Sequence, residues 1–312
     1  MVTLADVRSA HALISKAVIR TPVLPLKFAE RPATFVKCEN LQRTGAFKLR
    51  GAMNRVARLP RSCKGVTASS SGNHAQAVAF AARMRGIKAC IVMLDQSVPH
   101  KVEGTKGYGA EVILGGADST LIRERAEREA AERGYVYIPP FNDPHVIAGQ
   151  GTVGLEIVQD LPDVKAVVVQ IGGGGLISGV AAAVKGLKPR CKVFGVEPEG
   201  AAAMLRSLEA GKLVTLDRVD TIADGLKPVA AGDLTFDHVK KFVDDVVLVS
   251  DAEIMAAAKH LLLREKLVVE PSGAASLAAI FAGKLKLPKG PVVAILSGGN
   301  ADVRAILDWG GA

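Results

Sequence analysis

Apolar residues in this chain gather in short blocks, and longer stretches with helical spacing separate the blocks. Such blocks are typical of strands buried in a parallel sheet. The pattern predicts strands at residues 34–39, 65–70, 88–93, 111–116, 135–139, 164–171, 192–197, 245–249 and 291–296. Because strands and helices alternate along nearly the whole chain, the expected fold class is α/β, with largely parallel sheets flanked by helices.

Four consecutive glycines follow the block 164–171 and precede a helix-compatible run. They are Gly172, Gly173, Gly174 and Gly175. Glycine amides let a phosphate approach closely, and the positive end of the next helix faces the same anion. A tight turn is the simpler alternative, but it needs only about one or two glycines. Phosphate binding is therefore the favoured interpretation.

The same segment is similar to the nicotinamide-dinucleotide-binding unit, with Glu197 as its ribose-binding acid. The glycine spacing does not match that unit. A G-x-G-x-x-G pattern begun at Gly172 places Ile177 in the third glycine position, and one begun at Gly173 places Ser178 there. The dinucleotide interpretation therefore remains only an alternative.

Thr44 and Gly45 indicate a turn, and Phe47 and Lys48 follow at the start of a helix-compatible run. The start of a helix is its positive end, so a lysine there is electrostatically misplaced. Held as a neutral amine, it can form a Schiff base with an aldehyde cofactor such as pyridoxal phosphate. In a chain with 40 basic residues, a solvated surface lysine is the simpler alternative. For Lys48 alone the surface interpretation is favoured. Only the other segments in which a predicted strand meets a helix favour a catalytic lysine.

Two further junctions carry polar side chains. Ser69, Ser70, Ser71 and Asn73 lie where the strand 65–70 meets a helix, and they suit a carboxylate or a phenolate oxygen. An ordinary helix cap explains them as well. Ser297 closes the strand 291–296 and could bond a ring nitrogen, but alone it is a weak signal.

The chain contains, in order, the motifs TGAFKLRGA, SSGNHAQA, GGGGL and LSGGN, with PFNDPHVIAGQGT and VVEPSGA between them. These motifs resemble the fold-type II pyridoxal-phosphate enzymes, specifically the serine/threonine dehydratase and serine racemase group. The resemblance covers the chain from residue 21 to residue 300. It implies a two-domain fold like that of the tryptophan synthase β subunit. Residues 1–53 and 144–312 would form a large cofactor-binding domain and 54–143 a small inserted domain, with the cofactor in the cleft between them.

The resemblance also assigns roles to residues. Lys48 would carry pyridoxal 5'-phosphate covalently, and Phe47 would pack on the cofactor ring. Asn73 would bond the phenolic oxygen, Ser297 the pyridine nitrogen, and the four glycines the phosphate. The substrate is implied to be a small amino acid, whose binding residues would be Ser70, Ser71, Gly72, His74 and Asn142.

The implied reaction converts L-threonine or L-serine to a 2-oxo acid and ammonia, with Lys48 as the base. A neutral serine at the pyridine nitrogen weakens the electron sink and favours this elimination. In racemases resembling this chain, the residue at Ser71 stands on the opposite face of the cofactor, so a serine/threonine racemase stays open. A helix cap explains Ser71 equally well. A nicotinamide-dependent oxidoreductase and a cofactor-binding protein without turnover remain as further alternatives.

A cation site is uncertain. Metal-dependent members of the group carry a glutamate, a carbonyl donor and an aspartate; Glu197 and Ala201 match the first two, but Ala203 replaces the aspartate. A hard divalent cation loses an anionic ligand there. We expect a monovalent ion, a weak divalent site or no ion, in which case Glu197 is a strand-end carboxylate.

Composition and charge agree with an enzyme of this kind. A length of 312 residues suits two α/β domains, and 49% apolar with only 4% aromatic residues indicates helices packed through small aliphatic side chains. The net charge of +9 is dispersed, so a nucleic-acid partner is not expected. The four cysteines form no C-x-x-C pair, and no run is long enough for a membrane span. The expected location is the cytoplasm, and the family resemblance implies a homodimer.

Overall fold

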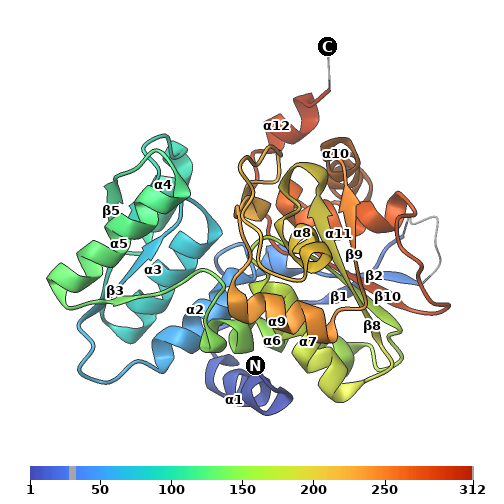
Figure 1. Ribbon diagram of the computed structural model, residues 1–312, viewed down its shortest axis with the longest axis horizontal. Coiled ribbons are helices and arrows are strands. Elements are labelled where there is room, and N and C mark those ends of the chain that lie inside the picture. Colours follow the sequence, from blue (N-terminus) through green and yellow to red (C-terminus); the bar gives the residue numbers. More distant parts are fainter. Residues whose placement is uncertain (28–32, 311–312) are drawn as a thin grey trace.

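The computed structural model describes residues 1–27 and 33–310, whose strands form two sheets flanked by helices (Figure 1). The larger sheet contains, in spatial order, β1 (Val23–Pro25), β2 (Thr34–Lys37), β10 (Val292–Ile295), β7 (Ala166–Gln170), β8 (Lys192–Pro198) and β9 (Asp245–Val249). The smaller sheet contains β5 (Glu111–Leu114), β4 (Lys88–Met93), β3 (Gly65–Ser69) and β6 (Val136–Tyr137). Within the described residues, neighbouring strands are parallel except for β1 and β2. The expected α/β fold is confirmed.

Every strand expected from an apolar block is present, with ends that differ by at most two residues. The sequence pattern misses β1, because three residues that end in Pro25 do not make an apolar block. β1 pairs antiparallel with β2 at the edge of the larger sheet. An edge is the part of a sheet where proline is tolerated, since its missing N–H costs no ladder bond there.

Twelve α-helices lie in the described part of the chain. They are α1 (Leu4–Ile14), α2 (Lys48–Ala57), α3 (Asn73–Arg85), α4 (Pro99–Gly107), α5 (Ser119–Arg133), α6 (Pro144–Asp160), α7 (Gly175–Leu187), α8 (Ala203–Ala210), α9 (Asp233–Phe242), α10 (Asp251–His260), α11 (Pro271–Phe281) and α12 (Val303–Asp308). Short 3-10 turns occupy η1 (Glu39–Leu41), η2 (Glu199–Ala201) and η3 (Asp224–Leu226), and η4 (Leu261–Glu265) is a π-helical turn that extends α10.

Apolar clusters cover both faces of each sheet. The larger sheet packs on α10 and α11 on one side and on α7 and α9 on the other. The smaller sheet packs on α2 and α3 on one side and on α5 on the other. Helix α2 also contacts α6, and Figure 1 shows it between the two sheets. The first residue of α2, Lys48, therefore lies where the two halves of the molecule meet.

The two sheets come from different parts of the chain. All strands of the smaller sheet lie between residues 65 and 137, and all described strands of the larger sheet lie outside that interval. In residues 1–27 and 33–310, no helix has both the length and the apolar character that a bilayer span requires.

Candidate active site

The candidate site is built on backbone contacts between the start of α2 and the end of β10. The Phe47 amide donates to the Ser297 carbonyl at 3.0 Å, and the Gly299 amide donates to the Gly45 carbonyl at 2.8 Å. These contacts place Lys48 close to Ser297, although nearly the whole chain separates the two residues. The structure therefore brings together the first and the last of the predicted junctions.

Lys48 is not a solvated surface lysine. Its ammonium donates to the Pro140 carbonyl at 2.8 Å and lies 5.3 Å from the centre of the Phe47 ring. Burial lowers the pKa of Lys48 to about 8, and no carboxylate in residues 1–27 or 33–310 compensates for the lost solvation. Near neutral pH, part of the Lys48 population is therefore the free amine, the form that bonds to an aldehyde or accepts a proton.

The segment that holds Lys48 also contacts the glycine loop. Pro140 accepts the hydrogen bond from Lys48, and its neighbour Phe141 packs directly on Gly173 and Gly175. A Cβ atom added to Gly173 would overlap the Phe141 ring. The lysine and the glycine loop therefore share one wall, formed by residues 140–141.

The glycine loop joins β7 to α7, as the sequence predicts. Gly174 is the N-cap of α7 with a φ of 90°, a left-handed conformation that favours glycine, and no side chain caps the first turn of the helix. A Cβ atom on Gly172 would lie 2.9 Å from the Gly225 carbonyl oxygen. Close packing thus explains part of this glycine content. The uncapped start of α7 is the arrangement in which a helix binds a phosphate.

Ser297 follows β10 and is only 4% exposed. Its carbonyl accepts the Phe47 amide. In the described part of the chain, no hydrogen bond of its hydroxyl is recorded, so the hydroxyl is available to a ligand.

Ser71 does not cap α3, so the helix-cap explanation of this residue is wrong. The N-cap is Gly72, which makes no side-chain capping bond. The Ser71 hydroxyl oxygen accepts from the Leu94 amide at 2.9 Å and from the Ser97 hydroxyl at 2.6 Å. Ser70 accepts the Gly72 amide at 3.2 Å. An uncapped helix start of this kind can bind an anion, so the carboxylate role of this segment stays a prediction.

Asn73 begins α3 and is held by two partners that the sequence analysis did not single out. Its Nδ2 donates to Glu270 Oε1 at 2.6 Å, and its Oδ1 accepts from Asn300 Nδ2 at 2.8 Å. Burial raises the pKa of Glu270 to about 7. Both partners lie in motifs that carry the family resemblance, VVEPSGA and LSGGN, and that position is the one sequence signal that could have identified them.

His74 is buried, and its Nε2 lies 2.9 Å from the Ile138 carbonyl oxygen. A carbonyl only accepts, so Nε2 carries the hydrogen and Nδ1 is the free acceptor. Burial and, to a smaller extent, the charge of Lys48 lower the pKa of His74 to about 3. His74 is therefore neutral at physiological pH and brings no positive charge to a substrate carboxylate.

Asn142 is exposed, and its hydrogen bonds connect it to α9. Its Nδ2 donates to Asp233 Oδ1 at 2.7 Å, and its Oδ1 accepts from the Leu234 amide at 3.2 Å. None of its recorded hydrogen bonds in the described residues reaches the segment 70–74. The structure thus joins Ser70, Ser71, Gly72 and His74 at one helix start and holds Asn142 on a different element.

Glu197 lies at the end of β8 and caps α8. Its carboxylate accepts from the Met204 amide at 2.9 Å and from the Leu205 amide at 2.8 Å. Burial raises the pKa of Glu197 to about 7, against the opposing effect of these two hydrogen bonds. In residues 1–27 and 33–310, no group of three or more His, Cys, Asp or Glu residues could hold a metal ion.

Comparison with known proteins gives the family. Residues 14–298 match the family model described as pyridoxal-phosphate dependent enzyme. The L-threonine ammonia-lyase of Thermotoga maritima is 45% identical over 98% of this chain and 77% of that protein. The catabolic L-threonine dehydratase of Staphylococcus aureus is 42% identical over 98% of this chain and 91% of that protein.

Solved structures agree with this result. A threonine deaminase from T.th. has a TM-score of 0.92 at 41% identity, covering 96% of this chain and 99% of that one. Maize serine racemase has a TM-score of 0.94 at 40% identity, covering 98% of this chain and 96% of that one. The nicotinamide-dependent alternative is therefore wrong. The chain belongs to the family of pyridoxal-phosphate dependent enzymes.

Proposed function

We propose that this protein is a pyridoxal-phosphate-dependent ammonia-lyase that converts L-threonine, L-serine or both to a 2-oxo acid and ammonia. The observation that carries the proposal is Lys48, a half-buried lysine with a lowered pKa at the start of α2, next to Ser297 and to residues 140–141 that pack on the glycine loop. The L-threonine ammonia-lyase and L-threonine dehydratase relatives support threonine as the substrate.

The residues present fit the cofactor. Lys48 would hold pyridoxal phosphate covalently, and Phe47 would pack on its ring. The uncapped start of α7 would bind the phosphate through the amides of residues 172–175, and the free hydroxyl of Ser297 would bond the pyridine nitrogen. Asn73 would donate to the phenolic oxygen. When bound, the cofactor supplies an electron-withdrawing ring that makes the α-hydrogen of the amino acid acidic.

The protein side chains would then perform the proton transfers. The Lys48 amine takes the α-proton, since a pKa of about 8 makes it a competent base near neutral pH. The Pro140 carbonyl, 2.8 Å from Nζ, holds the amine in place. Amides and hydroxyls at the start of α3, with neutral His74 behind them, would orient the substrate carboxylate. Ser297 offers a hydroxyl and no carboxylate to the ring nitrogen, which favours loss of the β-hydroxyl.

The test is a substrate panel on the purified holoenzyme. L-threonine, L-serine, hydroxyaspartate and phenylserine would each be assayed for 2-oxo acid and for the inverted enantiomer. We expect 2-oxobutanoate from L-threonine or pyruvate from L-serine. Absence of 2-oxo acid from every substrate, in a preparation that binds the cofactor, would refute the proposal and support the interpretation as a cofactor-binding protein without turnover.

Racemase activity is the second candidate, and Ser71 is the observation that favours it. The Ser71 oxygen accepts two hydrogen bonds, from Leu94 and Ser97, so its own hydrogen remains available to a ligand. The similarity to maize serine racemase agrees with such a role. The ratio of D-serine to pyruvate formed from L-serine measures how the two activities are divided.

We also propose the division into a domain of residues 1–53 and 144–312 and an inserted domain of residues 54–143, which the separation of the two sheets along the chain supports. A homodimer and a cytoplasmic location are proposed as well. The four cysteines are unpaired in the described structure, as is usual in a reducing compartment. Light scattering on the purified protein tests the dimer; a monomer mass at micromolar concentration would contradict it.

A further inference from the structure

Glu270 lies next to the candidate site and takes no part in the proposed proton transfers. It occupies the N-cap position of α11, yet its side chain makes no capping hydrogen bond to that helix. Its carboxylate instead accepts a hydrogen bond from Nδ2 of the Asn73 side-chain amide at 2.6 Å. A glutamate that bonds another segment instead of its own helix start needs an explanation other than helix capping.

The backbone fixes Glu270 close to Ser297. The Glu270 amide donates to the Gly298 carbonyl at 3.0 Å. A Cβ atom on Gly298 would overlap Glu270 Oε1 and lie 3.1 Å from Asn73 Nδ2. The glycine that follows Ser297 therefore leaves the space in which the carboxylate and the amide meet.

A count of hydrogens fixes the orientation of the Asn73 amide. The Asn300 Nδ2 group has two hydrogens, and it donates to the Thr44 carbonyl at 2.9 Å and to Asn73 Oδ1 at 2.8 Å. Asn73 Oδ1 must therefore face Asn300, and Asn73 Nδ2 must face Glu270. Glu270 takes one of the two Nδ2 hydrogens. For the second, no acceptor is recorded among the described residues.

We propose that Glu270 is a positioning residue of the cofactor site, which holds the Asn73 amide so that its second N–H stays available to the phenolic oxygen of pyridoxal phosphate. The inference rests on the proposed function, because that function gives Asn73 its ligand. Asn300 fixes which end of the amide carries the oxygen, and Glu270 fixes the remaining rotation by accepting one hydrogen. The pair acts on the cofactor through Asn73 alone.

Few charged groups among the described residues influence Glu270. Lys101 on α4 and Asp224 in η3 both influence its carboxyl, and these two groups lie 3.6 Å apart. Burial has the larger effect and raises the pKa of Glu270 to about 7. A protonated glutamate still accepts through its carbonyl oxygen, and so does a glutamine. If Glu270 acts as a hydrogen-bond acceptor, glutamine at this position should preserve its function and alanine should not.

The experiment compares Glu270→Ala, Glu270→Gln and the parent protein. The apoproteins would be titrated with pyridoxal phosphate to give a dissociation constant, and the visible absorbance of each holoenzyme would be recorded across pH. For Glu270→Ala we expect cofactor affinity about five- to tenfold weaker, the size expected for one lost hydrogen bond, and a shifted absorbance titration. Glu270→Gln should bind within about twofold of the parent.

Two further variants separate positioning from loss of structure. Glu253→Ala removes a carboxylate from the capping box of α10, outside the site, and should leave cofactor affinity unchanged. Asn300→Ala removes the other partner of Asn73 and should shift the absorbance titration as Glu270→Ala does. If Glu270→Ala does not fold, Asn300→Ala takes its place in the test. An absorbance titration of Asn300→Ala that equals that of the parent would then overturn the inference.

The outcomes distinguish this inference from the proposed function. If Glu270→Ala binds the cofactor like the parent, or if Glu270→Gln is as weak as Glu270→Ala, the positioning role is wrong while the proposed function stands. If the parent forms no covalent linkage that borohydride reduces, the proposed function fails, and this role of Glu270 fails with it.

Discussion

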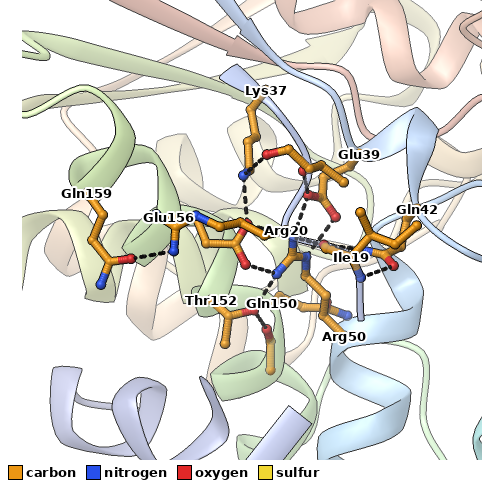
Figure 2. A network of polar contacts seen from close by, with 12 residues as sticks. Ile19, Arg20, Lys37, Glu39, Gln42, Arg50, Gln150, Thr152, Glu156 and Gln159 are labelled. Carbon is orange, nitrogen blue, oxygen red and sulfur yellow. Dashed lines mark hydrogen bonds and ion pairs between the residues drawn. The ribbon is translucent and has the colours of Figure 1, made fainter. Parts of the chain in front are cut away.

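Lys48 and Arg50 lie two residues apart on α2, and the structure surrounds their positive charges in opposite ways. The Arg50 guanidinium makes paired hydrogen bonds of 2.7–2.9 Å to Glu39 and to Glu156, and Lys37 bonds the same Glu156. Figure 2 shows Arg50 between the two carboxylates, with Lys37 beside them. Two cations and two anions therefore balance in one buried network.

Among the residues that the structure describes, Lys48 has one carbonyl partner and no carboxylate. Burial opposes the charge of both residues, but Glu39 and Glu156 more than compensate at Arg50, whose pKa stays above its usual value. At Lys48 the pKa falls to about 8. Burial alone therefore does not make a cation reactive: the paired cation fixes α2 in place, and the unpaired one can give up its proton.

The largest expected effect comes from Lys48→Ala. The variant removes the covalent anchor and the base together, so turnover should fall by at least about 1,000-fold. The fold should persist, because no carboxylate in the described part of the chain loses a partner. The assays are 2-oxo acid release and borohydride trapping, with the exposed Lys16→Ala as the control. If borohydride still traps the cofactor on Lys48→Ala, another residue forms the covalent linkage.

Arg50→Met should act on stability more than on chemistry. It leaves Glu39 and Glu156 buried without their main cation, which we expect to cost about 3–5 kcal/mol in the free energy of unfolding. Urea titration measures this loss. The double variant Arg50→Met with Glu39→Gln should recover part of it, because one of the unpaired charges is removed. A loss below about 1 kcal/mol would mean that this network does not hold α2 in place.

The pH dependence of cofactor attachment tests the low pKa of Lys48 directly. Attachment needs the free amine, so its rate in the apoprotein should rise with pH and level off above about pH 8. Stability changes with pH in the same direction. Between about pH 8 and 10.5 the unfolded lysine holds a proton that the folded one has released, so the free energy of unfolding rises with pH. A rate still rising steeply at pH 10 would show that Lys48 is an ordinary lysine.

Two buried carboxylates, Glu156 and Glu197, differ in the same way. Burial opposes the charge of Glu156, but Arg50 and Lys37 hold its pKa below the usual value, whereas burial raises the pKa of Glu197 to about 7. Between about pH 4.5 and 7 the folded Glu197 holds a proton that the unfolded one has lost, so its contribution to stability declines as pH rises. Glu197→Gln should flatten this decline in unfolding curves measured from pH 4.5 to 7. If the slope of unfolding free energy against pH is unchanged in Glu197→Gln, a group other than Glu197 titrates in this range.

The smallest effect on elimination is expected from Ser71→Ala. Lys48 supplies the base for elimination, so 2-oxo acid formation should stay within about tenfold, equal to roughly 1.4 kcal/mol of barrier. Any conversion of L-serine to D-serine should disappear, because it needs a proton donor on the other face. Chiral chromatography gives the ratio of D-serine to pyruvate. A parallel fall of both products by orders of magnitude would indicate that Ser71 holds the substrate or the cofactor instead.

Local patterns account for what could be predicted from the sequence. Short apolar blocks predict the strands, and the glycine run and the lysine at a helix start mark both junctions correctly, because each depends on neighbouring residues. The network of Arg50 with Glu156 and the contact of Asn73 with Glu270 could not be predicted in this way. Their partners lie 106 and 197 residues apart along the chain; the packing of α2 on α6 brings the first pair together, and the second pair forms where the starts of α3 and α11 meet.

The hydrogen bond from Phe47 to Ser297 also bears on the order in which the molecule forms. Its two residues enclose most of the chain, so closing this loop costs more entropy than any strand pairing within the smaller sheet. Native pairings of such long range slow folding. During synthesis on the ribosome, Lys48 emerges long before the segment that completes its pocket. A nascent chain that has not reached residue 297 would therefore hold the smaller sheet without a finished cofactor site, and cofactor capture would be a late event in biogenesis.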